Sequence, residues 1–205
     1  MKKNGLLIAC EGIDGSGKSL LANNLFKALQ AKGIKSLLTK EPGATDLGKQ
    51  LRTILHSTEI QKCGLAEFLL FAADRAQHFS QTIDPALTAG SIVISDRMAD
   101  SSLAYQGYGR DLDLTMIKQV NSWAMQHQKP DLTLYLRIDP KIAHQRIEQR
   151  SEALTSFEQE RDQFWKKVCH GFETIFANRS DVVILDATLS PQELTTIALQ
   201  AILNL

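Results

Sequence analysis

The chain has 205 residues, a formal net charge of zero, 43% hydrophobic residues and 22% charged residues. That length favours one domain with a sizeable core. A zero net charge argues against a nucleic-acid partner, because dedicated nucleic-acid-binding proteins usually carry a basic excess. No apolar run reaches the length of a signal-peptide core or a membrane-spanning helix, so we expect a cytoplasmic protein with no membrane partner.

Short apolar runs typical of buried strands alternate along the chain with stretches of helical periodicity. The predicted strands cover residues 6–10, 34–39, 91–96, 132–138 and 182–185. The first predicted helix follows residue 19 and ends near residue 32. Later helices are predicted at 46–55, 65–83, 101–106, 113–127 and 139–150, in the segment from Phe157 to Phe176, and after Ser190.

Strands that alternate with helices predict an α/β fold, in which helices cover both faces of a parallel sheet. We expect one domain over residues 1–205. Pro85 is predicted to end the long helix before it, and residues 107–110 are predicted to form a loop. The aromatic residues between Phe157 and Phe176 follow helical spacing, which core packing alone explains.

The segment GIDGSGKS follows the first predicted strand and fits the phosphate-loop pattern G-x-x-x-x-G-K-[ST]. Glycines let the backbone N–H groups approach a phosphate, and the helix that follows adds the positive end of its dipole. We expect Lys18 to reach the β- and γ-phosphates and Ser19 to bind Mg²⁺. The alternative is a glycine-rich turn without a ligand. The residues predicted to contact the nucleotide are Gly12, Ile13, Asp14, Gly15, Ser16, Gly17, Lys18 and Ser19.

Asp96 ends the third predicted strand and Arg97 follows it. Because the carboxyl ends of parallel strands meet at one edge of a sheet, Asp96 is expected beside the phosphate loop, where it can hold Mg²⁺. Arg97 can clamp a phosphate with two hydrogen bonds. The alternative is a surface ion pair at a strand end.

Arg146 and Arg150 are four residues apart, so they share one face of a helix that leads into an irregular segment. We interpret residues 146–158 as a lid that closes over ATP and brings an arginine to the moving phosphoryl group. The alternative is a charged face exposed to solvent.

Phe71 and Arg75 also lie four residues apart, on an otherwise apolar helix. A buried arginine needs a partner, so Arg75 should meet either an internal carboxylate or a ligand. Phe71 can stack on a flat ring, although a core phenylalanine beside a surface arginine is the alternative. The five histidines lack metal or catalytic-triad spacing, and we interpret each as a structural or surface residue.

Several segments together resemble the bacterial thymidylate kinase family over nearly the whole chain. They are EGIDGSGKS, KEPGATDLG, LLFAADRAQHF, SDR, SSLAYQG and PDLTLYLRIDP. The resemblance implies a three-layer P-loop NTPase fold with a five-stranded parallel sheet flanked by helices. It also implies transfer of the γ-phosphoryl group of ATP to dTMP with Mg²⁺, giving dTDP and ADP, by an enzyme that is usually a homodimer.

The resemblance also implies roles for individual residues. Asp14 would contact the sugar and phosphate region of the acceptor, and Arg52 and Arg97 would clamp its phosphate. Phe71 would stack on thymine and Arg75 would donate to its O4 atom. The residues implied at the base edge are Ser101, Ser102 and Gln106. Tyr105 would fill the space that a ribose 2′-hydroxyl needs.

One class of the family has an arginine in the phosphate loop, where this chain has Gly15, and the other class supplies it from the lid. The chain resembles the second class. Its lid ends in Thr155-Ser156-Phe157-Glu158, without the arginine usual in that motif, so Arg150 is predicted to contact the transferred phosphoryl group. The predicted catalytic residues are Asp14, Lys18, Arg97 and Arg150.

Two other functions stay open at this stage. One is a kinase acting on a different small nucleotide or nucleoside, which a comparison of acceptors would distinguish. The other is a GTP-dependent switch, although such proteins usually read guanine with an Asn-Lys-x-Asp segment, and this sequence contains none.

Overall fold

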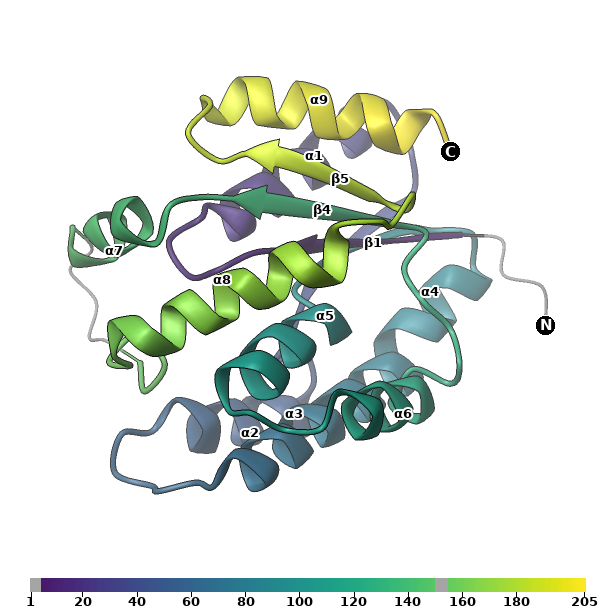
Figure 1. Cartoon of the computed structure of the whole chain (residues 1–205). Coiled ribbons are helices and arrows are strands. Elements are labelled where there is room, and N and C mark those ends of the chain that lie inside the picture. Colours follow the sequence, from purple (N-terminus) through teal and green to yellow (C-terminus); the bar gives the residue numbers. More distant parts are fainter. Residues whose placement is uncertain (1–4, 150–154) are drawn as a thin grey trace.

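The computed structural model describes residues 5–149 and 155–205. Its five strands form one parallel sheet in the order β2-β3-β1-β4-β5. The strands are β1 Leu6–Glu11, β2 Ser36–Lys40, β3 Ile92–Asp96, β4 Leu132–Arg137 and β5 Val182–Asp186. This confirms the α/β fold with a five-stranded parallel sheet (Figure 1).

Helices cover both faces of the sheet (Figure 1). The helical segments are α1 Lys18–Ala31, α2 Asp46–His56, α3 Gly64–His78, η1 Phe79–Ile83, α4 Asp84–Thr88, α5 Ala99–Ser102, η2 Leu103–Gly109, α6 Leu114–Ala124, α7 Pro140–Glu148, α8 Asp162–Phe176 and α9 Pro191–Leu203. Within the described residues, none of these helices has both the length and the apolar character required to cross a bilayer.

Strand β1 lies at the centre of the sheet and is buried on both faces. Ile8 and Cys10 belong to a core cluster that includes Leu25 of α1, whereas Leu7 and Ala9 pack in a second cluster with residues of η1 and α4. A strand with two buried faces reads as a continuous apolar run, which explains the sequence of β1. Each buried leucine or isoleucine contributes about 1.5–3 kcal/mol to folding.

The register of the strands brings their carboxyl ends together. Cys10 pairs with Asp96 of β3, and Glu11 pairs with Tyr135 of β4. The phosphate-loop segment that follows β1 and the residues that follow β3 therefore leave the sheet at the same edge. This arrangement positions the site described below.

Two predictions of helix ends are wrong. Pro85 does not end a helix, because α3 continues through η1 into α4, where Pro85 lies in the first turn and its missing N–H is tolerated. Residues 107–109 are not a loop but the end of η2. Gly109 permits close packing there, since a Cβ atom on it would lie 2.5 Å from the ring of Phe164 in α8.

The aromatic stripe is a core feature, as its spacing indicated. Phe164, Trp165, Phe172 and Phe176 of α8 are buried in the main core cluster. Phe157 is buried with them, but it precedes α8 and is not helical, so the prediction that helical spacing starts at Phe157 is wrong.

Candidate active site

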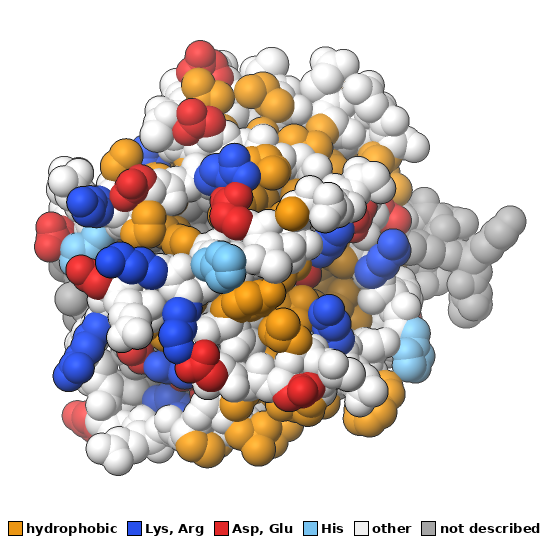
Figure 2. Space-filling model, viewed as in Figure 1, with side chains coloured by type: hydrophobic (Ala, Val, Ile, Leu, Met, Phe, Trp, Pro, Cys, Tyr) orange, Lys and Arg blue, Asp and Glu red, His pale blue; other side chains and the backbone are white. Residues whose placement is uncertain are grey.

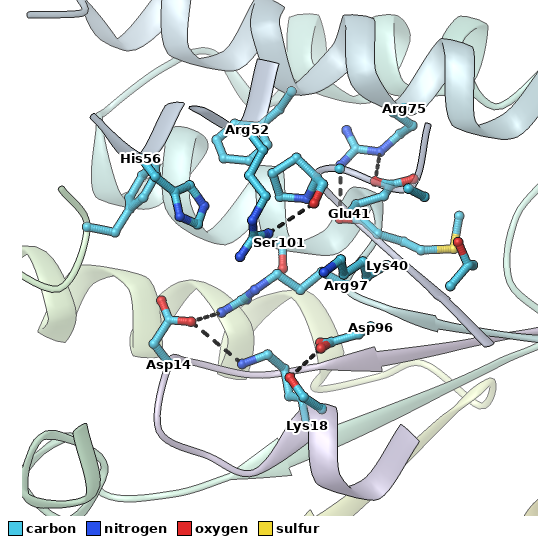
Figure 3. Close-up of a pocket in the computed structure, with 18 of the residues that line it drawn as sticks. Asp14, Lys18, Lys40, Glu41, Arg52, His56, Arg75, Asp96, Arg97 and Ser101 are labelled. Atoms are coloured by element: carbon cyan, nitrogen blue, oxygen red, sulfur yellow. Dashed lines mark hydrogen bonds and ion pairs between the residues drawn. The ribbon is translucent and has the colours of Figure 1, made fainter. Parts of the chain in front are cut away.

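A cavity of about 760 Å³ opens at the carboxyl edge of the sheet. Its size is typical of a site for a small-molecule ligand. The phosphate-loop segment, the segment after β2, helices α2 and α3, and the segment from β3 to η2 all contribute to its walls. Figure 3 shows that charged side chains from these separate elements converge on it.

The phosphate-loop segment has the conformation its glycines predict. Gly12 and Gly15 have φ values of 142° and 80°, which disfavour other residues. A Cβ atom on Gly15 would also lie 2.3 Å from the carbonyl oxygen of Ala143 in α7. The loop is therefore closely covered by α7, and it leads directly into α1.

Lys18 points back across this loop. Its Nζ atom donates to the carbonyl oxygen of Ile13 at 2.7 Å and lies 3.9 Å from the Asp14 carboxylate. Burial, and then the nearby charge of Arg97, lower the pKa of Lys18, whereas the Asp14 and Asp96 charges raise it, and the net pKa is about 8. Lys18 is buried and lines the cavity, where its amine can bind an anion.

The predicted magnesium ligands Ser19 and Asp96 lie together. The Ser19 hydroxyl donates to the Asp96 carboxylate at 2.5 Å, although the two residues are 77 positions apart. Two oxygen ligands are a small set, but Mg²⁺ usually takes one or two protein oxygens and completes its shell with water and phosphate oxygens. The pair fits such an ion. Within the described residues, no cluster of three or more His, Cys, Asp or Glu residues forms a metal site.

Arg97 is the centre of a polar cluster at the mouth of the phosphate loop. Its guanidinium donates to Asp14 at 2.5 Å, to the Gly12 carbonyl oxygen at 2.8 Å, to Ser101 at 3.0 Å and to Tyr105 at 3.1 Å. Burial alone would raise the pKa of Asp14, but the Arg97 and Lys18 charges hold it well below its usual range. Asp14 is thus ionised at neutral pH.

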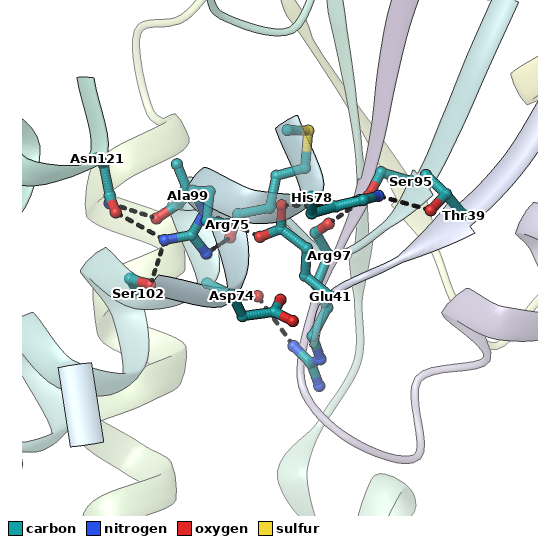
Figure 4. A network of polar contacts seen from close by, with 12 residues as sticks. Thr39, Glu41, Asp74, Arg75, His78, Ser95, Arg97, Ala99, Ser102 and Asn121 are labelled. Atoms are coloured by element: carbon teal, nitrogen blue, oxygen red, sulfur yellow. Dashed lines mark hydrogen bonds and ion pairs between the residues drawn. The ribbon is translucent and has the colours of Figure 1, made fainter. Parts of the chain in front are cut away.

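Arg75 meets the internal carboxylate that was one of its two predicted partners. Its Nε atom donates to Glu41 at 2.8 Å, and its Nη atoms donate to Ser102, Asn121 and the Met98 carbonyl oxygen (Figure 4). The residue is 1% exposed and nevertheless lines the cavity. Because Arg75 borders the cavity, contact with a ligand, its other predicted partner, stays a prediction.

The remaining residues predicted at the base line the same cavity. They are Phe71, Ser101, Ser102, Tyr105 and Gln106. The Gln106 side chain donates to Glu67 at 2.9 Å, and the Phe71 ring lies 5.8 Å from that of Phe157. These contacts fix the orientation of both side chains before any ligand arrives.

Glu41, His56 and Phe157 are among the cavity residues that were not predicted from the sequence as site residues. Glu41 follows β2 at the carboxyl edge, so the rule that selected Asp96 could have found it. Phe157 comes from the segment before α8 and was assigned to the core. Only the three-dimensional structure places His56 there.

His56, interpreted from the sequence as a structural or surface residue, lines the cavity one helical turn after Arg52 of α2 (Figure 3). Burial, and then the Arg52 charge, lower the pKa of His56 to about 4, so the imidazole is neutral at pH 7. Arg52 donates to the Pro42 carbonyl oxygen at 3.0 Å and also lines the cavity.

The structure brings the last residues of the predicted lid, Thr155, Phe157 and Glu158, to the same cavity as most of the predicted site, but not Arg146. Arg146 lies in α7, where its guanidinium donates to the Ala187 carbonyl oxygen at 3.0 Å, and it is not among the residues that line the cavity. Arg150 lies outside the described residues. The roles of both arginines stay predictions.

A five-stranded parallel sheet, a glycine-rich loop that opens a helix, and a lysine, serine and aspartate at one sheet edge define a P-loop nucleoside-triphosphate-binding protein. The thymidylate kinase family model matches residues 10–197. The chain therefore belongs to the thymidylate kinase family.

Curated relatives agree with this family. The chain is 41% identical over 192 residues to a thymidylate kinase of Halothermothrix orenii, covering 93% of this chain and 92% of the relative. It is 43% identical over 190 residues to a thymidylate kinase of Synechococcus sp., covering 92% and 89%. A thymidylate kinase of Prochlorococcus marinus is 44% identical over 187 residues, with coverage of 88% and 87%.

Phosphorylation of dTMP is the function of this family, and its members are ATP-dependent kinases. The predicted family and enzyme class are therefore confirmed.

Proposed function

We propose that this chain transfers the γ-phosphoryl group of ATP to dTMP, with Mg²⁺, and that the cavity holds the acceptor beside the phosphate loop. One observation carries the assignment of sites. The anion-binding groups Lys18 and Arg97 line the same cavity as Phe71 and Arg75, which suit a pyrimidine base. A cavity with these two kinds of lining matches a nucleoside monophosphate.

At the donor side, Lys18 binds the β- and γ-phosphates of ATP, and the backbone N–H groups of residues 12–19 surround them. Ser19 and Asp96 would hold Mg²⁺. The bound ion would neutralise charge on the phosphate oxygens. Phosphoryl transfer has a loose transition state, so positioning and charge neutralisation carry most of the catalysis.

At the acceptor side, Arg97 and Arg52 bind the phosphate of dTMP. Arg97 is already oriented by Asp14 and Ser101, which reduces the conformational freedom lost on binding. Asp14 contacts the sugar and phosphate region. It keeps its negative charge at neutral pH, so it also holds the Arg97 guanidinium in place.

At the base, Phe71 stacks on thymine and Arg75 donates to its O4 atom. Ser101, Ser102 and Gln106 border the base edge, and Tyr105 occupies the space that a ribose 2′-hydroxyl would need. The support for this arrangement is that all six residues line one cavity, although they come from α3, α5 and η2.

For the lid, residues 146–158, we propose that Arg150 contacts the transferred phosphoryl group and that Arg146 assists at the nucleotide. The Arg146 side chain would have to leave the Ala187 carbonyl oxygen to do so. Arg150→Ala should then lower kcat far more than it raises KM, because the contact forms only during transfer.

An acceptor panel tests the proposed function. Purified protein with ATP and Mg²⁺ is offered dTMP, dCMP, AMP or deoxythymidine, and nucleoside diphosphate is measured by chromatography. We expect product with dTMP far above the others, loss of activity with EDTA, and almost none with Lys18→Ala of unchanged circular dichroism. Preference for another acceptor, or activity without a divalent ion, would contradict the proposal.

We also propose that the chain forms a homodimer through the layer of α2, α3 and α6. Leu65 and Leu69 of α3 and Trp123 of α6 are 46%, 49% and 67% exposed, and Figure 2 shows hydrophobic side chains along the lower edge, where these helices lie. A patch of large apolar side chains indicates an interaction surface. Sedimentation should give a dimer that Leu69→Glu converts to a monomer, whereas Leu203→Glu on α9 should not.

A further inference from the structure

Glu11 is a buried carboxylate to which the proposed mechanism gives no role. It is the last residue of β1, it is 0% exposed, and it immediately precedes the phosphate loop. Three hydrogen bonds reach it from the segment after β3. Its Oε1 atom accepts from the Met98 N–H at 2.9 Å and the Ser101 N–H at 3.2 Å, and its Oε2 atom accepts from the Ser101 hydroxyl at 2.5 Å.

These hydrogen bonds hold the segment that directly follows Arg97, the residue proposed to bind the acceptor phosphate. Arg97 lies between β3 and Met98, with φ of 71°, a conformation that side chains other than glycine rarely adopt. Its N–H donates to the Cys10 carbonyl oxygen at 2.9 Å, directly before Glu11 in the chain. The end of β1 therefore holds the unfavourable backbone of Arg97 from both sides.

A second connection runs through the side chains. The Ser101 hydroxyl gives its only proton to Glu11, so its lone pairs are free to accept from the Arg97 guanidinium, which donates to it at 3.0 Å. Figure 3 shows Ser101 next to Arg97 at the cavity. The ionised carboxylate thus fixes the direction of the serine proton, and the serine fixes one edge of the guanidinium. Burial, and then the Asp100 charge, raise the pKa of Glu11 to about 7, so the ionised form predominates in assays above that pH.

We propose that Glu11 is a positioning residue for acceptor binding, which acts through Met98 and Ser101 to hold Arg97 in its binding conformation. This inference rests on the proposed role of Arg97 as a ligand of the dTMP phosphate. Glu11 does not touch the substrate. It prepares the backbone and guanidinium of Arg97 before the substrate arrives.

Glu11→Gln tests the proposal with little change of shape. The amide oxygen still accepts from the Met98 and Ser101 N–H groups, but the amide nitrogen meets the Ser101 oxygen as a donor and turns the hydroxyl proton away. We expect the KM for dTMP to rise at least about fivefold, the scale of one weakened hydrogen bond to a charged group. The KM for ATP should stay within about twofold, because Glu11 has no contact with Lys18 or Ser19 among its hydrogen bonds.

A double-mutant cycle with Ser101→Ala shows whether the effect passes through the serine. In the Ser101→Ala background, Glu11→Gln should raise the KM for dTMP much less, because the side-chain connection is already lost. Additive effects would overturn the connection through Ser101. A parallel rise in both KM values would mean general damage to the fold and would overturn the positioning role.

Asp100→Asn is the matched control. Asp100 is a buried carboxylate next to Ser101 in α5, and it accepts from Arg179 at 2.8 Å. Its charge acts on Glu11 through space, but within the described residues it has no hydrogen bond with Glu11 or Arg97. This variant should leave the KM for dTMP within about twofold. An effect equal to that of Glu11→Gln would show that any buried charge near Arg97 has this influence and would overturn the proposal.

Two further variants separate the possible failures. If Glu11→Gln does not fold, Glu11→Asp replaces it. Its charge is kept but its reach is shorter, so an unchanged KM for dTMP would overturn the inference. Arg97→Lys should weaken dTMP binding on the proposed function alone. If Arg97→Lys binds dTMP normally, the assignment of Arg97 fails, whereas a loss there with none in Glu11→Gln removes only the role of Glu11.

Discussion

Arg75 is a buried residue that belongs to the polar interior and is also proposed to contact the ligand. It is bonded to Glu41, Ser102 and Asn121, and it borders the cavity proposed for thymine. A guanidinium fixed in this way can reject a base that presents a donor, because neither partner could move to repair the mismatch.

The first prediction concerns base selection by Arg75. Thymine presents an acceptor at O4, and cytosine presents an amino donor at that position. Arg75→Met should lower kcat/KM for dTMP at least about tenfold, equivalent to roughly 1.4 kcal/mol, and lower that for dCMP less. Steady-state assays with both acceptors measure the ratio.

Phe71→Ala is the control, because stacking serves either pyrimidine and both acceptors should weaken together. An unchanged dTMP-to-dCMP ratio in Arg75→Met would make Arg75 purely structural. Since that variant also leaves the buried Glu41 without its main partner, its melting temperature must be measured beside the wild type.

The second prediction concerns Asp74, a buried carboxylate one residue before Arg75. Its Oδ1 atom accepts from the Gly43 N–H at 3.0 Å, and its Oδ2 atom has no hydrogen-bond partner within the described residues. Burial, and then the Glu41 charge, raise the pKa of Asp74 to about 6. A raised pKa in the fold means that the stabilising contribution is complete below the ordinary pKa and is lost as the pH rises through about 6.

Asp74→Asn cannot ionise, so it should avoid this loss. The free energy of unfolding of the variant minus that of the wild type should therefore increase by about 1–2 kcal/mol as the pH rises from 4.5 to 7.5. Urea unfolding at both pH values measures the difference. Groups that do not interact with Asp74 cancel because both proteins share them, whereas the nearby Glu41 and His78 contribute to the difference. A difference that stays constant with pH would contradict the assignment.

At the scale of elements, the strands were predictable and the helix ends were not. All five predicted strands form within two residues of their observed limits, because each contains a short apolar run that is visible in the local sequence. The end of η2 was predicted to be a loop because glycine is common in turns, but it is also used where two elements pack closely. Its use in close packing depends on a neighbour, here Phe164, that no local pattern reveals.

The site residues also divide into those that the local sequence predicts and those that it does not. The phosphate loop and Asp96 follow from local rules, since one is a contiguous motif and the other a carboxylate at a strand end. Roles at the base were available only from the resemblance. His56 and Phe157 could not be found from their local sequence, because their place at the cavity depends on how α2 and the segment before α8 pack against the rest of the chain.

The third prediction belongs to the contact between η2 and α8. Gly109→Ala would place a Cβ atom 2.5 Å from the Phe164 ring, so the ring or the helix must move. Overpacking of this kind costs about 1–3 kcal/mol. Thermal unfolding should show a lower melting temperature, although alanine is the better helix former.

Gly64→Ala serves as the matched glycine. A Cβ atom there meets the Cβ atom of Arg110 at 3.1 Å, a looser contact than the 2.5 Å at Gly109, so a smaller shift relieves it. Its melting temperature should change less than that of Gly109→Ala. Equal changes would mean that the contact with Phe164 is not the cause.

At the scale of the whole molecule, the main core cluster extends from α1, through the sheet, to α8. Tyr135 of β4 is part of it, with its ring 5.4 Å from that of Phe172. A continuous core of this kind predicts that damage far from the cavity is felt throughout the domain.

The fourth prediction follows from this continuity. Phe172→Ala should lower the free energy of unfolding by about 3–5 kcal/mol, because it leaves a cavity in the core. Urea unfolding measures the change, and fluorescence and circular dichroism should give one shared transition if the domain unfolds as a unit. Ile197→Ala, at a residue 43% exposed on α9, should change it far less. Separate transitions would show that the two faces of the sheet unfold independently.

The close cover of the phosphate loop by α7 also limits the routes along which this sequence can evolve. Gly15 occupies the place where one class of the family has an arginine, and here even a single added carbon would meet the Ala143 backbone. A change to arginine at position 15 would first require an earlier change that moves α7 away. The order of those two mutations is thus imposed by geometry, and lineages that keep this α7 position keep glycine at position 15.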